Sequence, residues 1–364
     1  MYSVYFHPLS KFPGPPLAAA SILPATLQTF RGTLQQWVIE QHRHYGPVVR
    51  IRPNELSFIT DSAWKDIYAH RQGHPQMPKI MRTKPINGAP SLMSANDADH
   101  ARQRKLLSAA FSDHALREQE PVIKSYVDLL VKQLREESDR NVNGVDMVEW
   151  FTYTTFDIIG DLSFGVPFGN LANKKPHPWV STFKSGIKQG ILFVAIRSLG
   201  IPLFDSILYP LVSPIFQQKR HEQFKYAQAA VRERLNTKTE RPDFISNFLR
   251  DNDTSVVPQA EIESIFTIVA LAGCESPATA LSGATYYLLR NPAVYKKLQD
   301  EIRNLQTDDD LSIANLSRLP YLRAVLEESL RVYPAVPAAM DRVVPPEGRA
   351  VSISWRKYPS GVQT

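Results

Sequence analysis

The sequence from Ile265 to Ala280, IFTIVALAGCESPATA, decides the fold. Its first seven residues, Ile265 to Leu271, are apolar on every face of a helix, which is the pattern of a helix buried on all sides. The same helix then carries Glu275, and burying a carboxylate costs several kcal/mol unless the group is paired, solvated or protonated. The stretch therefore predicts a core helix that borders a polar partner or a wet cavity.

The residues on either side of Glu275 favour such a cavity. Pro277 has no N–H for the carbonyl of Gly273, and its ring crowds that carbonyl, so we expect the helix to kink or open here. Ser276 can turn its hydroxyl back to the carbonyl of Ala272 or out to a ligand. These residues predict a small polar site, and a helix bend that serves packing alone is the alternative.

Cys274 is the only cysteine of the chain, so an internal disulfide is excluded and a reducing compartment is compatible. A reactive thiol needs a positive neighbour or a helix N-terminus, whereas Cys274 is followed by Glu275. We interpret it as a small core residue. A hydrolase with Cys274 as nucleophile is the rival interpretation, and it predicts labelling of the folded chain by a thiol reagent.

Composition restricts the class of protein. With 364 residues, 43% of them hydrophobic, the chain can bury a sizeable core. Its 42 Lys and Arg against 36 Asp and Glu give a charge of +6 that is spread along the sequence. This does not favour nucleic-acid binding, although it is compatible with ordinary solubility, an acidic partner or an anionic membrane. His70 and His74 have metal-ligand spacing, but Gly73 and Pro75 oppose the helix that would aim both at one ion.

Membrane contact is predicted to be peripheral at most. No run of eighteen apolar residues is present, and the opening MYSVYFHPLSKFPGPP does not resemble a signal peptide. The best candidate for contact is Gly190 to Phe216, which charges and prolines divide into short pieces. Core packing explains that segment equally well.

Helical patterns dominate the chain. The segment FPGPPLAA, Phe12 to Ala19, is expected to be rigid and extended, and VVRIRPNELSFIT is expected to form a hairpin around Pro53-Asn54. We therefore predict one mainly α domain over residues 1–364, with a small β-sheet made largely from the N-terminal part and the C-terminal end. The expected helices are Leu34–His44, Ala98–Phe111, Glu118–Glu137, Val148–Phe164, Pro178–Ser198, Pro214–Asn236, Pro242–Asp251, Pro258–Arg290, Pro292–Leu305 and Pro320–Val332.

Three further pairs of residues are candidates for chemistry. His100 and Arg104 in HARQR share one face of a helix and could hold an anion, although a solvated basic face is the default. Glu328 and Arg331, in LPYLRAVLEESLRVYP, can form an ion pair of a kind that is usually surface decoration. Asp157 and Asp161 lie on adjacent turns of one helix and cannot flank a substrate, which argues against a glycosidase-like hydrolase.

The order of these motifs along the chain resembles that of a eukaryotic cytochrome P450, a haem-thiolate monooxygenase. YFHPLSKFPGP looks like the segment after the membrane anchor of fungal members, and AGCESP lies where the family has its oxygen-binding helix motif. HARQR looks like the C-helix motif, and ESLR matches the K-helix glutamate–arginine pair. The K-helix stretch with the following RVVPPEG is the most specific part, and WFTYTTFDIIGDLSFG resembles fungal secondary-metabolism members.

The resemblance implies a fold, a cofactor, partners and site residues. His100 and Arg104 would reach the propionates of haem b, Gly273 would lie beside the haem, and Glu328 with Arg331 would help to form its pocket. Glu275 and Ser276 would relay protons to dioxygen. The family implies oxidation of a hydrophobic natural product, electrons from NADPH through a flavoprotein reductase, and the endoplasmic reticulum membrane; without the anchor, this chain would be cytoplasmic or peripheral.

The sequence also departs from the family pattern. Ser276 replaces a threonine, and Pro277 replaces the threonine or serine that follows it. The loop phenylalanine-x-x-glycine-x-arginine-x-cysteine-x-glycine, which supplies the axial thiolate, is not found in the 364 residues. We therefore expect a C-terminally truncated chain without the axial ligand, inactive as written. An active enzyme of which this is a partial chain, and a non-catalytic binding or scaffold remnant, are the alternatives.

Overall fold

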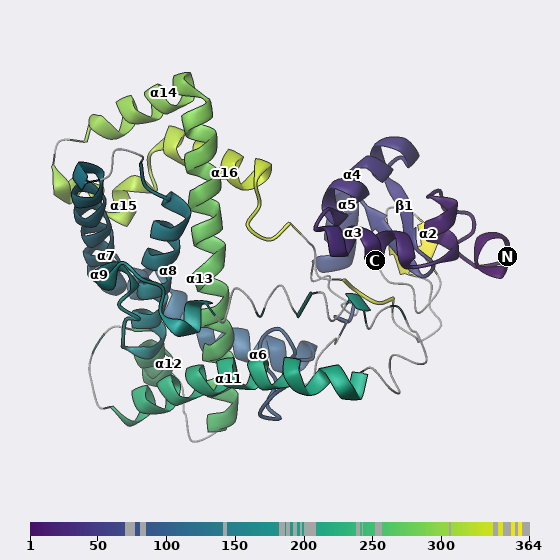
Figure 1. Ribbon diagram of the computed structural model, residues 1–364, viewed down its shortest axis with the longest axis horizontal. Coiled ribbons are helices and arrows are strands. Elements are labelled where there is room, and N and C mark those ends of the chain that lie inside the picture. The colour runs from purple at the N-terminus through teal and green to yellow at the C-terminus, as the bar shows by residue number, and fades with distance from the viewer. Residues whose placement is uncertain are drawn as a thin grey trace.

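The computed structural model describes most of the chain. It covers residues 1–69, 77–80, 85–140, 144–181, 209–237, 243–251, 257–305, 307–337, 341–344, 351–353 and 356–358, with positions 186, 190–191, 195–196, 199 and 241. Figure 1 shows a helical lobe, through which α13 runs lengthwise, and a smaller N-terminal lobe beside it. The described residues are mainly α-helical, as predicted.

The helical lobe is built around α13 (Gln259–Arg290), which packs against α8 (Met147–Phe164) and α11 (Tyr209–Asn236). Within the described part of the chain, α13 alone is long and apolar enough to span a bilayer by length and composition. A core helix meets the same criteria, and its buried neighbours mark α13 as one. The core around it includes Phe156, Ile159, Val231, Phe248, Ile265, Phe266, Ala270 and Cys274.

The remaining helices surround this core. They are α6 (Asp97–Ser108), η1 (Ala109–Phe111), α7 (Asp113–Arg140), α9 (Asn170–Asn173), α12 (Phe244–Asp251), α14 (Pro292–Arg303), η4 (Asp308–Leu311), α15 (Ile313–Leu316) and α16 (Pro320–Val332). The expected helices are confirmed to within a few residues at their ends. The predicted helix Pro178–Ser198 lies largely outside the described residues.

The N-terminal lobe carries α1 (Tyr2–Tyr5), α2 (Pro16–Ala20), α3 (Leu23–Arg31), α4 (Leu34–Tyr45) and α5 (Asp61–Tyr68). These helices surround the hairpin of β1 (Val48–Arg52) and β2 (Glu55–Phe58), which confirms the turn predicted at Pro53-Asn54. The lobe has its own core, made by Leu9, Phe12, Val48, Leu56, Ala63, Ile67, Met77 and Val344. The extended segment predicted over Phe12–Ala19 is wrong in its second half, because Pro16 begins α2 and its fixed φ suits the first helical position.

The predicted sheet is corrected in one respect. Strands β3 (Val351–Ile353) and β4 (Arg356–Tyr358) form a second antiparallel pair, and β1–β2 and β3–β4 are separate two-stranded sheets within the described residues. The two ends of the chain nevertheless meet, because Val344 lies in the core of the N-terminal lobe and β3 contacts α5. A bridge between Lys79 and Arg342 adds to this junction.

Gly273 sets the distance between α13 and α8. A Cβ at this position would lie 2.5 Å from Cδ1 and 2.9 Å from Cγ1 of Ile159. The helix continues through Pro277 to Arg290 without a break in secondary structure, so the opening we expected at Pro277 does not interrupt it. The missing side chain at Gly273 is therefore filled by α8 and is not open space.

Gly273→Ala is expected to destabilise the chain by about 1–3 kcal/mol, because the new methyl group overlaps Ile159 in a packed core. The free energy of unfolding, measured by urea titration, should show the loss. The same substitution in an Ile159→Val background is the control, since that change removes the nearest atom, and the two effects should be less than additive. Equal losses in both backgrounds would contradict the contact.

Candidate functional site

Glu275 lies on the side of α13 that is turned away from the contact of Gly273 with α8. Each helical residue turns the chain by about 100°, so Glu275 is about 200° from Gly273, the position that touches Ile159. Glu275 is half-buried, and its Oε2 is buried without a hydrogen-bond donor among the described residues. A buried carboxylate oxygen without a donor is costly unless a ligand or water meets it. A polar atom of Glu275 is therefore turned towards the inside of the molecule, and a polar site beside it stays a prediction.

Ser276 makes the backbone contact that its position predicted. Its Oγ donates a hydrogen bond of 2.5 Å to the carbonyl of Ala272, four residues earlier. The hydroxyl must therefore leave this carbonyl, or share its lone pairs, to reach a ligand. Glu275 and Ser276 are neighbours on one turn of α13 and can serve one proton path, which stays a prediction.

Cys274 is a core residue, as predicted. It is fully buried and belongs to the cluster between α8 and α13. Burial, with a smaller contribution from the negative charge of Glu275, raises the pKa of the Cys274 thiol well above its ordinary value. The thiol is therefore protonated at neutral pH and is a poor nucleophile or metal ligand.

Four basic side chains gather at the junction of the lobes. His100 and Arg104 come from α6, and Lys79 and Arg342 are opposite each other in the bridge between distant segments. Burial and then the charges of Lys79, Arg104 and Arg342 lower the pKa of His100, with only Asp97 opposing them. Burial and Arg342 likewise lower the pKa of Lys79. We call these four residues the basic cluster.

The basic cluster suits an anion. Burial is the largest cause of both lowered pKa values, and the neighbouring cations add to it, with Asp97 opposing them. Sequence reasoning found His100 and Arg104 but missed Lys79 and Arg342. No local signal could have paired these two, since they lie far apart in the sequence and meet only in the folded chain. Arg342 is buried and its guanidinium lies over the ring of Tyr68, 5.1 Å from the centroid.

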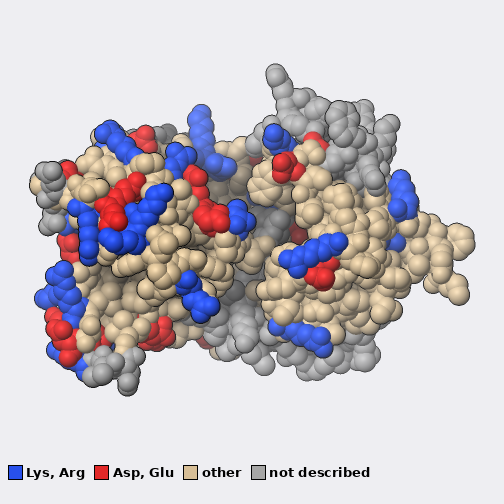
Figure 2. All heavy atoms as spheres, turned by 90° about the horizontal axis from the view of Figure 1, so that it is seen from above, with Lys and Arg blue, Asp and Glu red and all other residues tan. Residues whose placement is uncertain are grey.

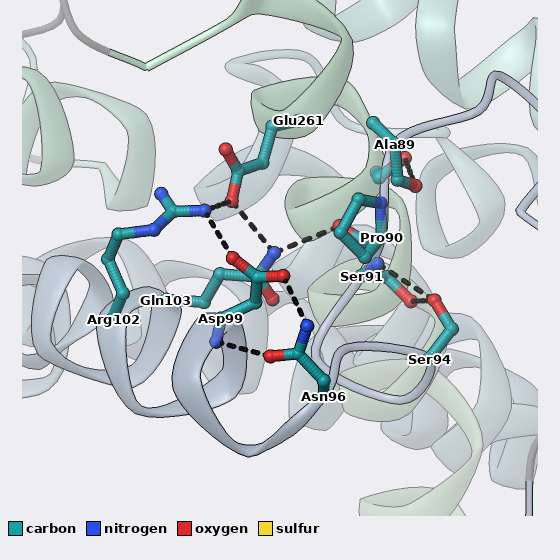
Figure 3. Close-up of polar contacts among 10 residues, drawn as sticks. Ala89, Pro90, Ser91, Ser94, Asn96, Asp99, Arg102, Gln103 and Glu261 are labelled. Carbon is teal, nitrogen blue, oxygen red and sulfur yellow. Dashed lines mark hydrogen bonds and ion pairs between the residues drawn. The ribbon is translucent and has the colours of Figure 1, made fainter.

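A hydrogen-bond network holds α6 against the start of α13, as Figure 3 shows. The buried Glu261 accepts bonds from Nη2 of Arg102 at 2.6 Å and from Nε2 of Gln103 at 2.8 Å. Gln103 also donates to the carbonyl of Pro90 at 2.9 Å. The helix that presents His100 and Arg104 is thereby fixed relative to the helix that presents Glu275.

The structure does not join the two predicted groups directly. Among the described residues, no hydrogen bond or ion pair connects Glu275 or Ser276 with His100 or Arg104. Along α13, Glu275 is fourteen residues from Glu261, which is about 21 Å at the rise of an α-helix.

The predicted pair of Glu328 and Arg331 forms on α16. Nε and Nη2 of the arginine donate to the two carboxylate oxygens at 2.6 and 2.7 Å. Both side chains are exposed, at 59% and 71%. The hydrogen bond and the charge of Arg331 lower the pKa of Glu328. Among the described residues, the ion pair of Glu328 and Arg331 therefore lies at the surface.

The remaining candidates have structural explanations or cannot be placed. Asp157 accepts hydrogen bonds from the backbone N–H groups of Asn170 and Leu171 at 3.0 and 2.8 Å, and Asp161 accepts one from the hydroxyl of Tyr126 at 2.6 Å. Their oxygens are engaged in folding contacts, which agrees with the argument against a hydrolase. His70 and His74 lie outside the described residues, and so does most of Gly190–Phe216; the described part holds no group of three potential metal ligands.

These residues fit haem in part. The basic cluster would pair with the two carboxylates of haem, and the buried Oε2 of Glu275 would meet a polar group. The residues do not fit the iron of haem, because Cys274 cannot supply a thiolate ligand. Cys274 is fully buried in the helix core and is protonated. The fold thus defines a mainly α-helical protein built around one buried core helix that carries a half-buried carboxylate.

Comparison with known proteins gives the family. The cytochrome P450 family model matches residues 13–347, and the chain belongs to the cytochrome P450 family. It is 42% identical to cytochrome P450 monooxygenase efuB of Hormonema carpetanum over 98% of this chain and 72% of that protein. It is 41% identical to cytochrome P450 monooxygenase astA of Talaromyces wortmannii over 96% and 71%, and 37% identical to versicolorin B desaturase stcL of Emericella nidulans over 96% and 71%. Its relatives are thus fungal P450s of secondary metabolism.

Lys79→Met is expected to raise the pKa of His100, because it removes a neighbouring cation. The native pKa of His100 lies below the ordinary 6.5, so the unfolded chain binds this proton more readily. The free energy of unfolding that neutral His100 contributes is present above pH 6.5. It is lost as the pH falls through the lower pKa that His100 has in the native chain. The Lys79→Met variant should therefore lose less free energy of unfolding than the parent chain when the pH is lowered from 6.5 through the native pKa of His100. Urea unfolding at several pH values, with an NMR titration of the histidine rings, measures both effects.

Lys105→Met is the matched control for this experiment, since Lys105 is an exposed cation on the same helix and is not among the charges that shift His100. An equal change of the His100 pKa in both variants would show that general charge, rather than the basic cluster, controls the titration.

Cys274 is expected to resist a thiol reagent in the native chain and to react fully in denaturant, because it is buried with a raised pKa. Intact mass measured over time follows the reaction, and the single cysteine makes the result unambiguous. Labelling of the folded chain at the rate of the unfolded one would show that the thiol is accessible.

Proposed function

We propose that this chain is the larger part of a haem-thiolate monooxygenase of fungal secondary metabolism that oxidises a hydrophobic small molecule. The observation that carries the proposal is the buried, donor-free Oε2 of Glu275 on the core helix of a member of the cytochrome P450 family. The relatives support the reaction class, since several are named as monooxygenases and one as a desaturase.

The residues would divide the work between binding and proton transfer. The basic cluster would hold the propionates, with Arg342 and Lys79 acting beside the predicted His100 and Arg104. Glu275 would take protons from water, and Ser276 would pass them on after its hydroxyl turns away from the carbonyl of Ala272. Haem ligated by a cysteine thiolate supplies the electron-rich iron on which dioxygen is activated.

The axial thiolate limits what the 364-residue polypeptide can do by itself. Its one cysteine is in the core of the helix bundle, with a raised pKa and no opening to a ligand. We therefore propose that these residues alone are inactive. The alternative of an active enzyme requires a cysteine loop supplied by residues other than these, and the chain spans about 71% of the length of the relatives it matches.

The partners follow from the reaction class. A two-electron supply to haem in this family implies a flavoprotein reductase that draws on NADPH, and the substrate would be an apolar molecule held beside α13. We propose the endoplasmic reticulum membrane as the place of work. A scaffold that retained the fold without the cofactor is the competing function, favoured by the absence of an available thiolate among the described residues.

The 364-residue polypeptide, incubated with haem, reduced and exposed to carbon monoxide, is expected to lack the thiolate-type absorption band for which the family is named. The matched control is the same polypeptide extended with the cysteine loop of one relative, which should show the band. A band in the unextended chain would refute the proposed inactivity. A folded, extended chain that takes up no haem would refute the monooxygenase proposal and favour the scaffold.

A further inference from the structure

The segment Asn87–Asn96 leads into α6 and contacts the start of α13, and Figure 3 shows polar contacts along it. It begins with the pair Asn87-Gly88, which is typical of a tight turn. Gly88 has a φ of 79°, a left-handed conformation that suits glycine. The backbone N–H of Ala89 donates to Oδ1 of Asn87 at 3.2 Å, so the asparagine side chain closes its own turn.

The side chain of Asn87 also joins this segment to α13. Its Nδ2 donates to the carbonyl of Ala260 at 2.7 Å, and its Oδ1 accepts from Oγ of Ser264 at 2.8 Å. Ser264 is 4% exposed, and its Oγ lies 3.2 Å from the carbonyl oxygen of Ala89. We call Asn87 and Ser264 the α13 clasp. Because a buried hydroxyl that loses its partner is costly, the clasp opposes separation of the segment from α13.

The same segment binds one member of the basic cluster. The carbonyl of Leu92 accepts a hydrogen bond of 3.0 Å from Nζ of Lys79. Leu92 lies in a compact turn, because the N–H groups of Ser94 and Ala95 both donate to the carbonyl of Ser91, at 2.9 and 2.8 Å. The position of the Lys79 ammonium group therefore depends on where this segment lies.

The charge of Lys79 acts on the ring of His100. After burial, the charges of Lys79, Arg104 and Arg342 lower the pKa of His100, and Asp97 opposes them. On the face drawn in Figure 2, positive and negative side chains are interspersed over the helical lobe, so the effects of more distant charges largely cancel. The pKa of His100 therefore reports how close the ammonium group of Lys79 is held.

We propose that the α13 clasp positions the basic cluster. The clasp holds the segment Asn87–Asn96 against α13, and the segment holds the ammonium group of Lys79 at the carbonyl of Leu92. The ammonium group thereby stays near enough to act on His100. The inference rests on the proposed function only for the identity of the anion, which would be the propionates of haem. The arrangement of the cations does not depend on the iron chemistry and is tested without haem.

Two variants of the 364-residue polypeptide open the clasp. Asn87→Ala removes both side-chain bonds to α13, and Ser264→Ala removes one of them. We expect both to raise the pKa of His100 towards 6.5, by less than Lys79→Met raises it, because the ammonium group is no longer held in place. NMR titration of the histidine rings measures the shift, and His100→Gln assigns the resonance. Ser264→Ala, the milder change, carries the test if Asn87→Ala does not fold.

Ser282→Ala is the matched control, since this hydroxyl is also on α13 but donates to the carbonyl of Ala278 within the same helix. It should leave the pKa of His100 unchanged. An equal rise of that pKa in Ser282→Ala and Ser264→Ala would overturn the proposal, because loss of any hydroxyl from α13 would then suffice.

A double-mutant cycle separates positioning from a general loosening of the fold. Asn87→Ala in the Lys79→Met background should change the pKa of His100 little, because the ammonium group through which the clasp acts is absent. An equal shift in both backgrounds would overturn the proposal, and so would an unchanged pKa of His100 with a lower urea midpoint in Asn87→Ala. A chain that shows the expected shifts but takes up no haem after extension with the cysteine loop would refute the proposed function and support the clasp.

Discussion

The close approach of α8 and α13 is the constraint on which the candidate site depends. Gly273 lets the two helices meet at Ile159, where any Cβ would overlap that side chain. This contact fixes the rotation of α13 and therefore the direction of every residue after it. Glu275, two residues on, must face away from α8, and its carboxylate reaches a buried position with no donor. Packing at one position thus determines the placement of a polar group at another.

A second polar contact transmits this arrangement to α6. Glu261 is a buried carboxylate in the first turn of α13. Arg102 and Gln103 on α6 donate hydrogen bonds to it. Because a buried carboxylate without its donors would be strongly unfavourable, α6 cannot slide along α13 without cost. His100 and Arg104 lie within one turn of these donors, so the position of these two members of the basic cluster depends on the same core helix. The network therefore links the helix of His100 and Arg104 to the helix of Glu275, although these residues do not touch.

The sequence predicted the parts of this fold whose signals are local. The apolar run before Leu271 identified α13, Pro53-Asn54 identified the hairpin, and the Ser276 contact followed from helix geometry. It could not predict contacts between distant segments, such as the bridge of Lys79 with Arg342, because neither segment has a periodic pattern. The prediction of one sheet was wrong for the same reason, since strand pairing depends on register and packing rather than on local preference.

The ion pair on α16 shows how far local prediction extends. Glu328 and Arg331 form the bidentate contact that their spacing allows. Leu322, Val325, Leu326 and Leu330 have the spacing of an apolar stripe on the same helix, yet only Val325 is buried. Water screens an exposed pair, and a charged pair strengthens only when it is enclosed with its hydrogen bonds complete. The structural role that the family resemblance implies for this pair can therefore operate only when the outer face of α16 is covered. That requirement agrees with the exposure of Leu326 and Leu330 on the same helix.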